Sequence, residues 1–220
     1  MREIRFISTC RGAKEETPLY ASLNRLGVGS RRFFEHNQRG LPECYNEALD
    51  DAAGSDTILV LAHSDVLIAD SFAAEKLDQV IGWADVIGVV GSAHFHADID
   101  AAAYRWSVWP REALSGAVEH VYGSLTAWAV FGPTPRRCVI LDGLLLAVDM
   151  LAIGPLRFDP QFRFHLYDLD FSLAAHRAGL VCATFNLYAQ HHSRGDYDTP
   201  AYRDAAAAFR RKWAGVREQC

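Results

Sequence analysis

The sequence predicts an α/β fold in which a mostly parallel sheet is covered by helices on both faces. Short apolar, β-branched segments alternate with helical segments through the first third of the chain. Residues 57–62 (TILVLA) form a continuous apolar run bounded by polar and turn residues, as expected of a strand buried on both faces. Strand–helix alternation at this spacing favours parallel strands joined by right-handed crossovers.

Local signals predict the elements of the first third in order. Residues 4–8 are apolar and β-branched, which indicates a strand. Thr17 and Pro18 are the cap and first residue of a helix whose apolar face carries leucines. A second strand is expected at 31–36, followed by a helix over 42–53 that Gly54 ends. The buried strand at 57–62 comes next.

The rest of the chain gives fewer periodic segments. Asp70 is expected to cap a helix that runs through Ile81, and residues 94–137 show no sustained period and are expected to form loops and short elements. Thr199 and Pro200 repeat the cap-plus-proline signal and start a helix through Trp213. The remaining expected elements are strands at 86–90, 139–148 and 181–185 and a helix at 167–178.

Length and composition exclude several classes of protein. The 220 residues are expected to form a single domain, 1–220, with residues 194–220 as a C-terminal loop and helical extension. A formal net charge of −5 gives no support for nucleic-acid binding. No apolar stretch approaches the roughly 20 residues of a membrane span, and the N-terminus lacks a signal peptide, so a cytoplasmic protein is expected. The five cysteines contain no CxxC and match neither a disulfide framework nor a zinc cassette.

The first candidate site follows the buried strand at 57–62. Ligands bind open α/β sheets beyond the carboxyl ends of the strands, and His63, Ser64 and Asp65 lie there. A carboxylate at this edge can ligate a cation that holds a diphosphate. The alternative is a turn carboxylate or a helix cap.

Two further clusters carry candidate chemistry. Asp168 and Asp170 open a predicted helix, where the macrodipole alone also favours acidic residues. His191 and His192 follow the last strand, and adjacent residues of an extended chain point to opposite sides, so at most one is a ligand. The alternative for the histidines is a surface loop.

The order of these features resembles a known family. Residues 43–49 (ECYNEAL), the buried strand and 63–66 (HSDV) are similar to the N-terminal signature of family 2-type glycosyltransferases. Later segments resemble the glycosyltransferase-like family related to the StrF domain of streptomycin biosynthesis. These segments are 141–148 (LDGLLLAV), 158–159, 164–172 (FHLYDLDFS), 178–179 and 191–195 (HHSRG). The resemblance covers residues 4 to 195.

The resemblance implies a single GT-A-like (Rossmann-like) domain that binds a nucleotide-diphosphate sugar with a divalent metal ion, Mn²⁺ or Mg²⁺. Asp65 would hold the metal-bound diphosphate, completed by His191 or His192, while Asp168 would be the catalytic base and Asp170 its partner. The metal neutralises the leaving diphosphate and the base deprotonates the acceptor hydroxyl, which inverts the anomeric centre. The other expected donor-binding residues are Ser8, Thr9, Arg11, Glu35, Asn37, Asn46, His63 and Ser64.

The acceptor is not identified by the sequence, but its pocket is expected in the aromatic middle region. Trp106, Trp109 and Trp128 have indole faces that suit stacking on sugar rings, with core packing as the equal alternative. Asp142 and Gly143 are also expected to contact substrate. The donor sugar, its base and the oligomeric state stay open.

The sequence departs from the family pattern at two positions. His63 stands where the first carboxylate of the Asp-x-Asp motif is expected, and Tyr167 replaces the Glu of Glu-Asp. The Gln-x-x-Arg-Trp motif of processive synthases is missing, so a non-processive enzyme is expected. Two alternatives stay open. One is a non-catalytic sugar-nucleotide or carbohydrate-binding module. The other is a nucleotidyltransferase whose candidate phosphate loop, residues 11–14 (RGAK), lacks the further glycines needed to surround a triphosphate.

Overall fold

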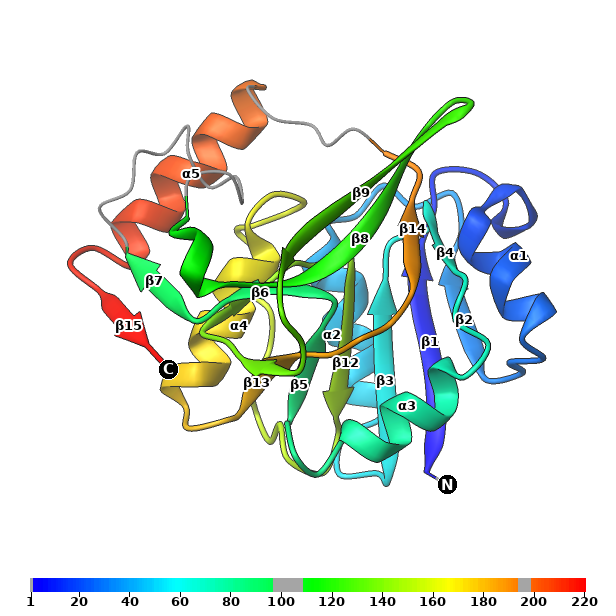
Figure 1. Ribbon diagram of the computed structural model, residues 1–220, viewed down its shortest axis with the longest axis horizontal. Coiled ribbons are helices and arrows are strands. Elements are labelled where there is room, and N and C mark those ends of the chain that lie inside the picture. The colour runs from blue at the N-terminus through cyan, green and yellow to red at the C-terminus, as the bar shows by residue number, and fades with distance from the viewer. Residues whose placement is uncertain (1, 97–108, 194–198) are drawn as a thin grey trace.

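Three sheets and five α-helices are the main elements of the computed structural model, which describes residues 2–96, 109–193 and 199–220 (Figure 1). The first sheet has seven strands in the order β10-β13-β5-β12-β3-β1-β2. Their bounds are β1 (Glu3–Thr9), β2 (Arg31–Phe34), β3 (Thr57–Ala62), β5 (Val86–Gly88), β10 (Arg136–Arg137), β12 (Leu145–Asp149) and β13 (Cys182–Thr184).

The second sheet has six strands, five of them in the order β11-β6-β8-β14-β4, with β9 paired to β8. Its strands are β4 (Val66–Ile68), β6 (Val90–Ser92), β8 (Leu114–Tyr122), β9 (Leu125–Gly132), β11 (Ile140–Leu141) and β14 (Ala189–His191). A third, two-stranded sheet pairs β7 (His94–His96) with β15 (Arg217–Gln219).

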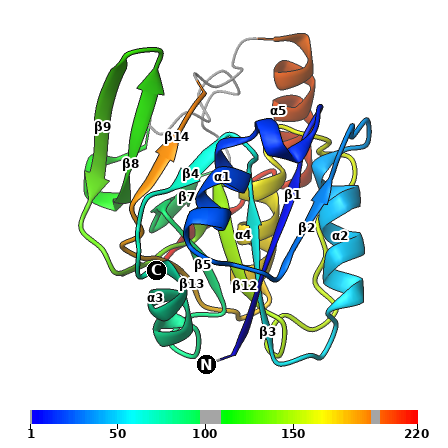
Figure 2. The same cartoon turned by 90° about the vertical axis from the view of Figure 1, so that its right-hand side faces the viewer.

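Helices cover the seven-stranded sheet on both faces, as Figure 2 shows. The helices are α1 (Pro18–Arg25), α2 (Leu41–Asp51), α3 (Ala73–Val80), α4 (Tyr167–Arg177) and α5 (Pro200–Lys212). One core joins α2, α4 and α5 to the sheet, and the other joins α1, α3 and the second sheet to its opposite face. The α5 residues Tyr202, Ala206 and Phe209 are buried in the first core, where Phe209 packs against Phe95 of β7 and against Phe162.

The predicted helix starts at Thr17 and Thr199 are confirmed. The hydroxyl of each threonine accepts a hydrogen bond from the backbone N–H three residues on, at 3.2 Å and 3.1 Å. The predicted cap at Asp70 is different, because α3 begins only at Ala73. Asp70 instead accepts from the N–H of Phe72 at 3.0 Å and pairs with Lys76 at 2.5 Å.

The expectation of a mostly parallel sheet is only partly right. Strands β1, β2 and β3 are parallel, and so are β5 and β13, but β12 is antiparallel to both of its neighbours. The predicted strand at 139–148 is interrupted by a turn at Asp142 and Gly143, which separates β11 from β12. Because this turn lies where β3 ends, β12 leaves it running in the opposite direction, and the sheet is mixed.

The middle of the chain is more regular than the sequence predicted. Residues 114–132 form a long hairpin of β8 and β9, which turns at Gly123 with φ of +66°. Apolar residues occur on both sides of these strands, so the alternation that identifies a half-buried strand is absent. None of the described helices has the length and apolar character to cross a bilayer.

Candidate metal and catalytic site

Three chain segments meet at the edge of the main sheet where β1, β2 and β3 end. The backbone N–H of His63, one residue past β3, donates to the carbonyl oxygen of Leu144 at 3.0 Å. The loop at 63–65 therefore lies against the turn that precedes β12. The first residues of α4 contact the same turn through Gly143. This is the sheet edge at which ligands bind in α/β folds.

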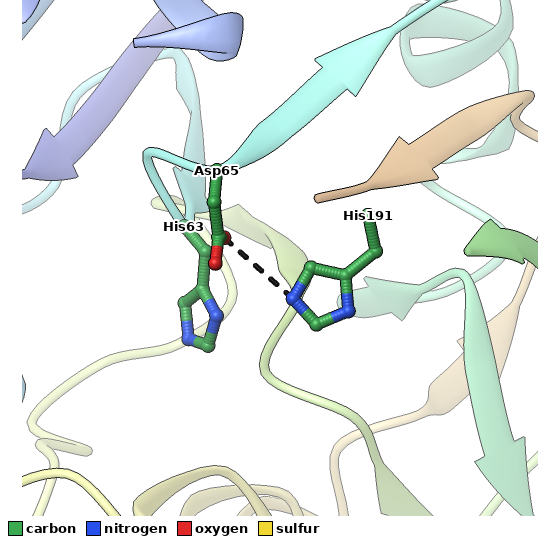
Figure 3. A group of neighbouring side chains, drawn as sticks. All are labelled: His63, Asp65 and His191. Atoms are coloured by element: carbon green, nitrogen blue, oxygen red, sulfur yellow. Dashed lines mark ion pairs between the residues drawn. The ribbon is translucent and has the colours of Figure 1, made fainter. Parts of the chain in front are cut away.

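His63, Asp65 and His191 form a cluster at this edge (Figure 3). One potential ligand atom from each of the three side chains lies within 4.8 Å of the other two. Nε2 of His191 is 3.6 Å from Oδ1 of Asp65. Strand β14 brings His191 to the site because it pairs with β4, which directly follows Asp65. Two imidazoles and one carboxylate are a common ligand set for divalent transition metals.

The electrostatics of Asp65 favour its ionised form. Burial opposes ionisation, but the imidazoles of His191 and His63 outweigh it and hold the pKa of the Asp65 carboxyl below its usual value. The Oδ1 atom is buried and has no hydrogen-bond partner within the described part of the chain. A buried carboxylate oxygen without a donor is a position that a cation can satisfy.

The two adjacent histidines separate as the sequence indicated. His191 is turned inward to Asp65, whereas the side chain of His192 is exposed. His192 contributes only its backbone N–H, which donates to the carbonyl oxygen of Asp65 at 2.9 Å. Of the two candidates, only His191 has a ligand atom in the cluster.

His63 is held by Tyr167, the first residue of α4. The distance from Nε2 of His63 to the Tyr167 hydroxyl is 2.8 Å, and the ring stacks on Phe164 with centroids 6.0 Å apart. Burial lowers the pKa of His63, so its imidazole is neutral at pH 7. Sequence reasoning gave Tyr167 no role, because it appeared only as a departure from the family pattern.

Asp168 follows Tyr167 in α4 and also contacts Gly143. Its Oδ2 atom accepts a 2.6 Å hydrogen bond from the backbone N–H of Gly143. Burial, and then the negative charge of Asp142, raise the pKa of Asp168 to about 7. A carboxyl with this pKa exchanges protons readily at neutral pH.

Asp170 is directed elsewhere. It is buried and accepts hydrogen bonds from Nζ of Lys212 at 2.9 Å and from Nε1 of Trp213 at 2.9 Å. Both partners belong to the end of α5 and the residue after it. The structure therefore gives Asp170 a bridging place between α4 and α5, away from Gly143 and Asp65.

Several expected donor-binding side chains have their polar atoms occupied within the protein. The Asn46 amide donates to the carbonyl of Phe158 and accepts from its N–H, each at 2.8 Å. The buried Ser8 hydroxyl donates to the carbonyl of Ala62 at 2.8 Å. These hydrogen bonds fix the loops of the site, which gives both side chains a structural place within the protein.

Glu35 and Asn37 lie together beyond the ends of β1 and β2. Glu35 accepts from both the backbone N–H and Nζ of Lys14, at 3.0 Å and 2.8 Å. Asn37 donates its backbone N–H to the carbonyl of Cys10 at 2.9 Å. Lys14 is the single lysine of residues 11–14, the candidate phosphate loop, and its ammonium group is paired with Glu35. Thr9 and Ser64 are half-buried at the same edge, and the Arg11 side chain is exposed.

Two of the three candidate tryptophans, Trp109 and Trp128, lie within the described residues, and they have different surroundings. Trp109 is 3% exposed and packs in the first core against Phe95, as its core alternative predicted. Trp128 is 53% exposed and stacks on Tyr188 with ring centroids 5.0 Å apart. Trp106 lies outside the described residues.

The second sheet separates Trp128 from the His63 cluster. Trp128 pairs with Glu119 across β9 and β8, and Glu119 pairs with Gln190 on β14. Successive residues of a strand point to opposite faces, so His191, next to Gln190, points to the face opposite Trp128. Alternation therefore places Trp128 outside any pocket that His191 lines.

Comparison with known proteins supports the fold and no more. No protein-family model matches the chain, and no curated protein is similar to it. Among solved structures, A197 from STIV aligns with a TM-score of 0.53 at 12% identity, covering 88% of this chain and 86% of that chain. CMP:2-keto-3-deoxy-manno-octonic acid synthetase complexed with CTP aligns at 13% identity over 96% of this chain and 99% of that chain. Its TM-score of 0.36 does not establish a shared fold. The likeness to A197 concerns the mixed α/β architecture alone.

Proposed function

We propose that this protein is a metal-assisted, non-processive glycosyltransferase that moves a sugar from a nucleotide-diphosphate donor to an acceptor hydroxyl. The observation that carries the proposal is the juxtaposition of two groups at one sheet edge. The His63–Asp65–His191 cluster suits a cation. Asp168, a carboxyl with a pKa of about 7, is connected to it through Gly143, which binds Asp168 by its N–H and Tyr167, the partner of His63, by its carbonyl oxygen. The resemblance to family 2-type glycosyltransferases supplies the reaction class.

The cluster fits a divalent cation on three grounds. Its ligand atoms converge within 4.8 Å, its carboxylate is ionised, and its buried Oδ1 atom has no donor among the described residues. His63, Asp65 and His191 would hold the cation. The cation, when bound, supplies Lewis-acid stabilisation of the charge that develops on the departing diphosphate.

Asp168 acts on the acceptor. Its ionised carboxylate takes the proton of the acceptor hydroxyl as that oxygen attacks the anomeric carbon. The hydrogen bond from Gly143 fixes the carboxylate, so the proton is transferred without prior rearrangement. Attack from the side opposite the leaving group inverts the anomeric centre.

Binding of nucleotides gives the first test. A thermal-shift screen compares nucleoside diphosphates and their sugars with and without Mn²⁺, since selective binding raises the unfolding temperature by mass action. The proposal expects a metal-dependent shift with a sugar nucleotide, followed by release of the nucleoside diphosphate. Metal-dependent binding without any turnover would favour a binding module, and release of pyrophosphate from a nucleoside triphosphate would favour a nucleotidyltransferase.

A further inference from the structure

Two groups in hydrogen-bond contact with the Tyr167 hydroxyl, the carbonyl of Gly143 and the imidazole of His63, compete for its one proton. The hydroxyl oxygen is 3.0 Å from the carbonyl oxygen of Gly143 and 2.8 Å from Nε2 of His63. A phenol carries a single O–H, and a carbonyl oxygen can only accept. Gly143 is buried, and a buried carbonyl without a donor is costly, so the Tyr167 proton is committed to Gly143.

This commitment determines the tautomer of His63. The Tyr167 oxygen has no second proton, so toward His63 it can only accept a hydrogen bond. Nε2 of His63 must therefore carry the hydrogen and donate it. A neutral imidazole protonated at Nε2 has its lone pair at Nδ1. Figure 3 shows the two ring nitrogens of His63, one turned toward His191 and the other turned away. With Nε2 on Tyr167, the nitrogen left for the cluster is Nδ1.

We propose that Tyr167 is a positioning residue that locks His63 in the Nε2–H tautomer, so that Nδ1 of His63, His191 and Asp65 form a site for a transition-metal ion. Hydrogen bonds to the second nitrogen of a ligating histidine characteristically set its tautomer and its basicity. Use of this ion in sugar transfer rests on the proposed function. The tautomer and the metal preference do not.

The ligand set also determines which cation is preferred. Mg²⁺, Ca²⁺ and Mn²⁺ favour oxygen ligands, whereas imidazole nitrogen suits Zn²⁺, Cu²⁺, Ni²⁺ and Fe²⁺. Two imidazoles with one carboxylate therefore select a transition metal and discriminate against Mg²⁺. Zn²⁺ is therefore expected to bind more tightly than Mn²⁺ or Mg²⁺, the two ions that the family resemblance implies.

The proposal also joins the two departures from the family pattern. His63 stands at the lost first carboxylate of Asp-x-Asp, and Tyr167 stands at the lost Glu of Glu-Asp. The structure places these two residues in hydrogen-bond contact although they are 104 positions apart. Gly143 completes the arrangement, because a Cβ there would lie 2.3 Å from the Tyr167 hydroxyl oxygen.

The tautomer is measured directly by ¹⁵N NMR of the histidine side chains in the metal-free protein, with the His63 signals assigned by their loss in His63→Gln. The expected result is a protonated Nε2 and an unprotonated Nδ1 at His63. A predominant Nδ1–H tautomer in the wild-type protein would overturn the proposal, whatever the activity. This measurement requires no change at Tyr167.

Metal affinity tests the consequence. Titration calorimetry with Zn²⁺, Mn²⁺ and Mg²⁺ alone is compared for the wild type, Tyr167→Phe and Tyr202→Phe, the last removing another buried hydroxyl of the same type. We expect Tyr167→Phe to weaken Zn²⁺ and Mn²⁺ binding about 10- to 100-fold and Tyr202→Phe to leave it unchanged. Wild-type binding of Mg²⁺ as tight as Zn²⁺, or full affinity in a folded Tyr167→Phe, would contradict the proposal. Metal binding without sugar transfer would reject the proposed function and leave this inference intact.

Discussion

The backbone N–H of Gly143 donates a 2.6 Å hydrogen bond to the carboxylate of Asp168. The same glycine accepts a hydrogen bond from Tyr167 through its carbonyl oxygen. One residue of the turn before β12 thus holds both the candidate base and the residue that orients His63. This glycine has no room for a side chain, since a Cβ would lie 2.7 Å from the Cβ of Asp168.

A methyl group at Gly143 is therefore expected to displace Asp168. Gly143→Ala should lower the transfer rate by about 10²-fold, because a displacement near 1 Å of a positioned group has an effect of that size. Steady-state rates at saturating donor measure it. Gly29→Ala is the control, since Gly29 is exposed and its added Cβ meets no atom within 4 Å. A rate for Gly143→Ala close to wild type would show that the contact does not matter for the reaction.

The raised pKa of Asp168 predicts the pH dependence of transfer. A base works only when ionised, so kcat/KM should rise with pH through about 7 and fall below it. The charge of Asp142 contributes to this raised pKa. Asp142→Asn removes a like charge and should move the rising limb to lower pH, although burial keeps it above an ordinary aspartate. If kcat/KM of Asp142→Asn rises over the same pH range as in the wild type, the pH dependence does not come from the Asp142–Asp168 pair.

Much of the fold was accessible from the sequence because its signals are local. Threonine-proline pairs set two helix starts, and the continuous apolar run at 57–62 identified the central strand. The antiparallel direction of β12 was not accessible, since an apolar run of residues does not encode strand direction. The two-residue interruption at Asp142 and Gly143 was the signal that could have divided the predicted strand at 139–148.

The adjacent histidines offer a matched pair of substitutions at the candidate metal centre. His191→Ala and Asp65→Ala should each abolish most of the metal-dependent gain in affinity for UDP or GDP, because each removes one of three ligands. His192→Ala should not, since that side chain is exposed and contributes only its backbone N–H to Asp65. Calorimetry with and without Mn²⁺ measures the gain. Equal losses of the metal-dependent gain in His191→Ala and His192→Ala would show that His191 is not a specific metal ligand.

Removal of Trp109 should lower stability, whereas removal of Trp128 should change neither stability nor sugar transfer. Trp109→Ala should cost about 3–5 kcal/mol of unfolding free energy, because a fully packed aromatic side chain is lost. Trp128→Ala should leave both stability and transfer at the metal site nearly unchanged, since Trp128 lies on the opposite face of the second sheet. Denaturant unfolding and transfer rates check the pair. Loss of acceptor binding in Trp128→Ala would restore the sequence-based expectation.

The candidate site was only partly predictable for a physical reason. Asp65 and Asp168 stood out because each follows a recognisable element boundary. His63 and Tyr167 looked like losses from a motif, because the contact between them forms only when β3 and α4 meet in three dimensions. Asp170 had the same sequence signal as Asp168. Only its pairing with Lys212 and Trp213 separates the two.

Release of nucleoside diphosphate from a saturating sugar nucleotide tests the central claim most directly, with wild type, Asp168→Asn and Asp170→Asn compared in the presence of Mn²⁺. The account predicts metal-dependent release by the wild type and unchanged donor binding by Asp168→Asn, with turnover slower by about 10²–10⁴-fold. Asp170→Asn should turn over near the wild-type rate and unfold more easily, since it disturbs the contact between α4 and α5. Near-wild-type turnover by Asp168→Asn, or the reverse ranking of the two variants, would contradict it.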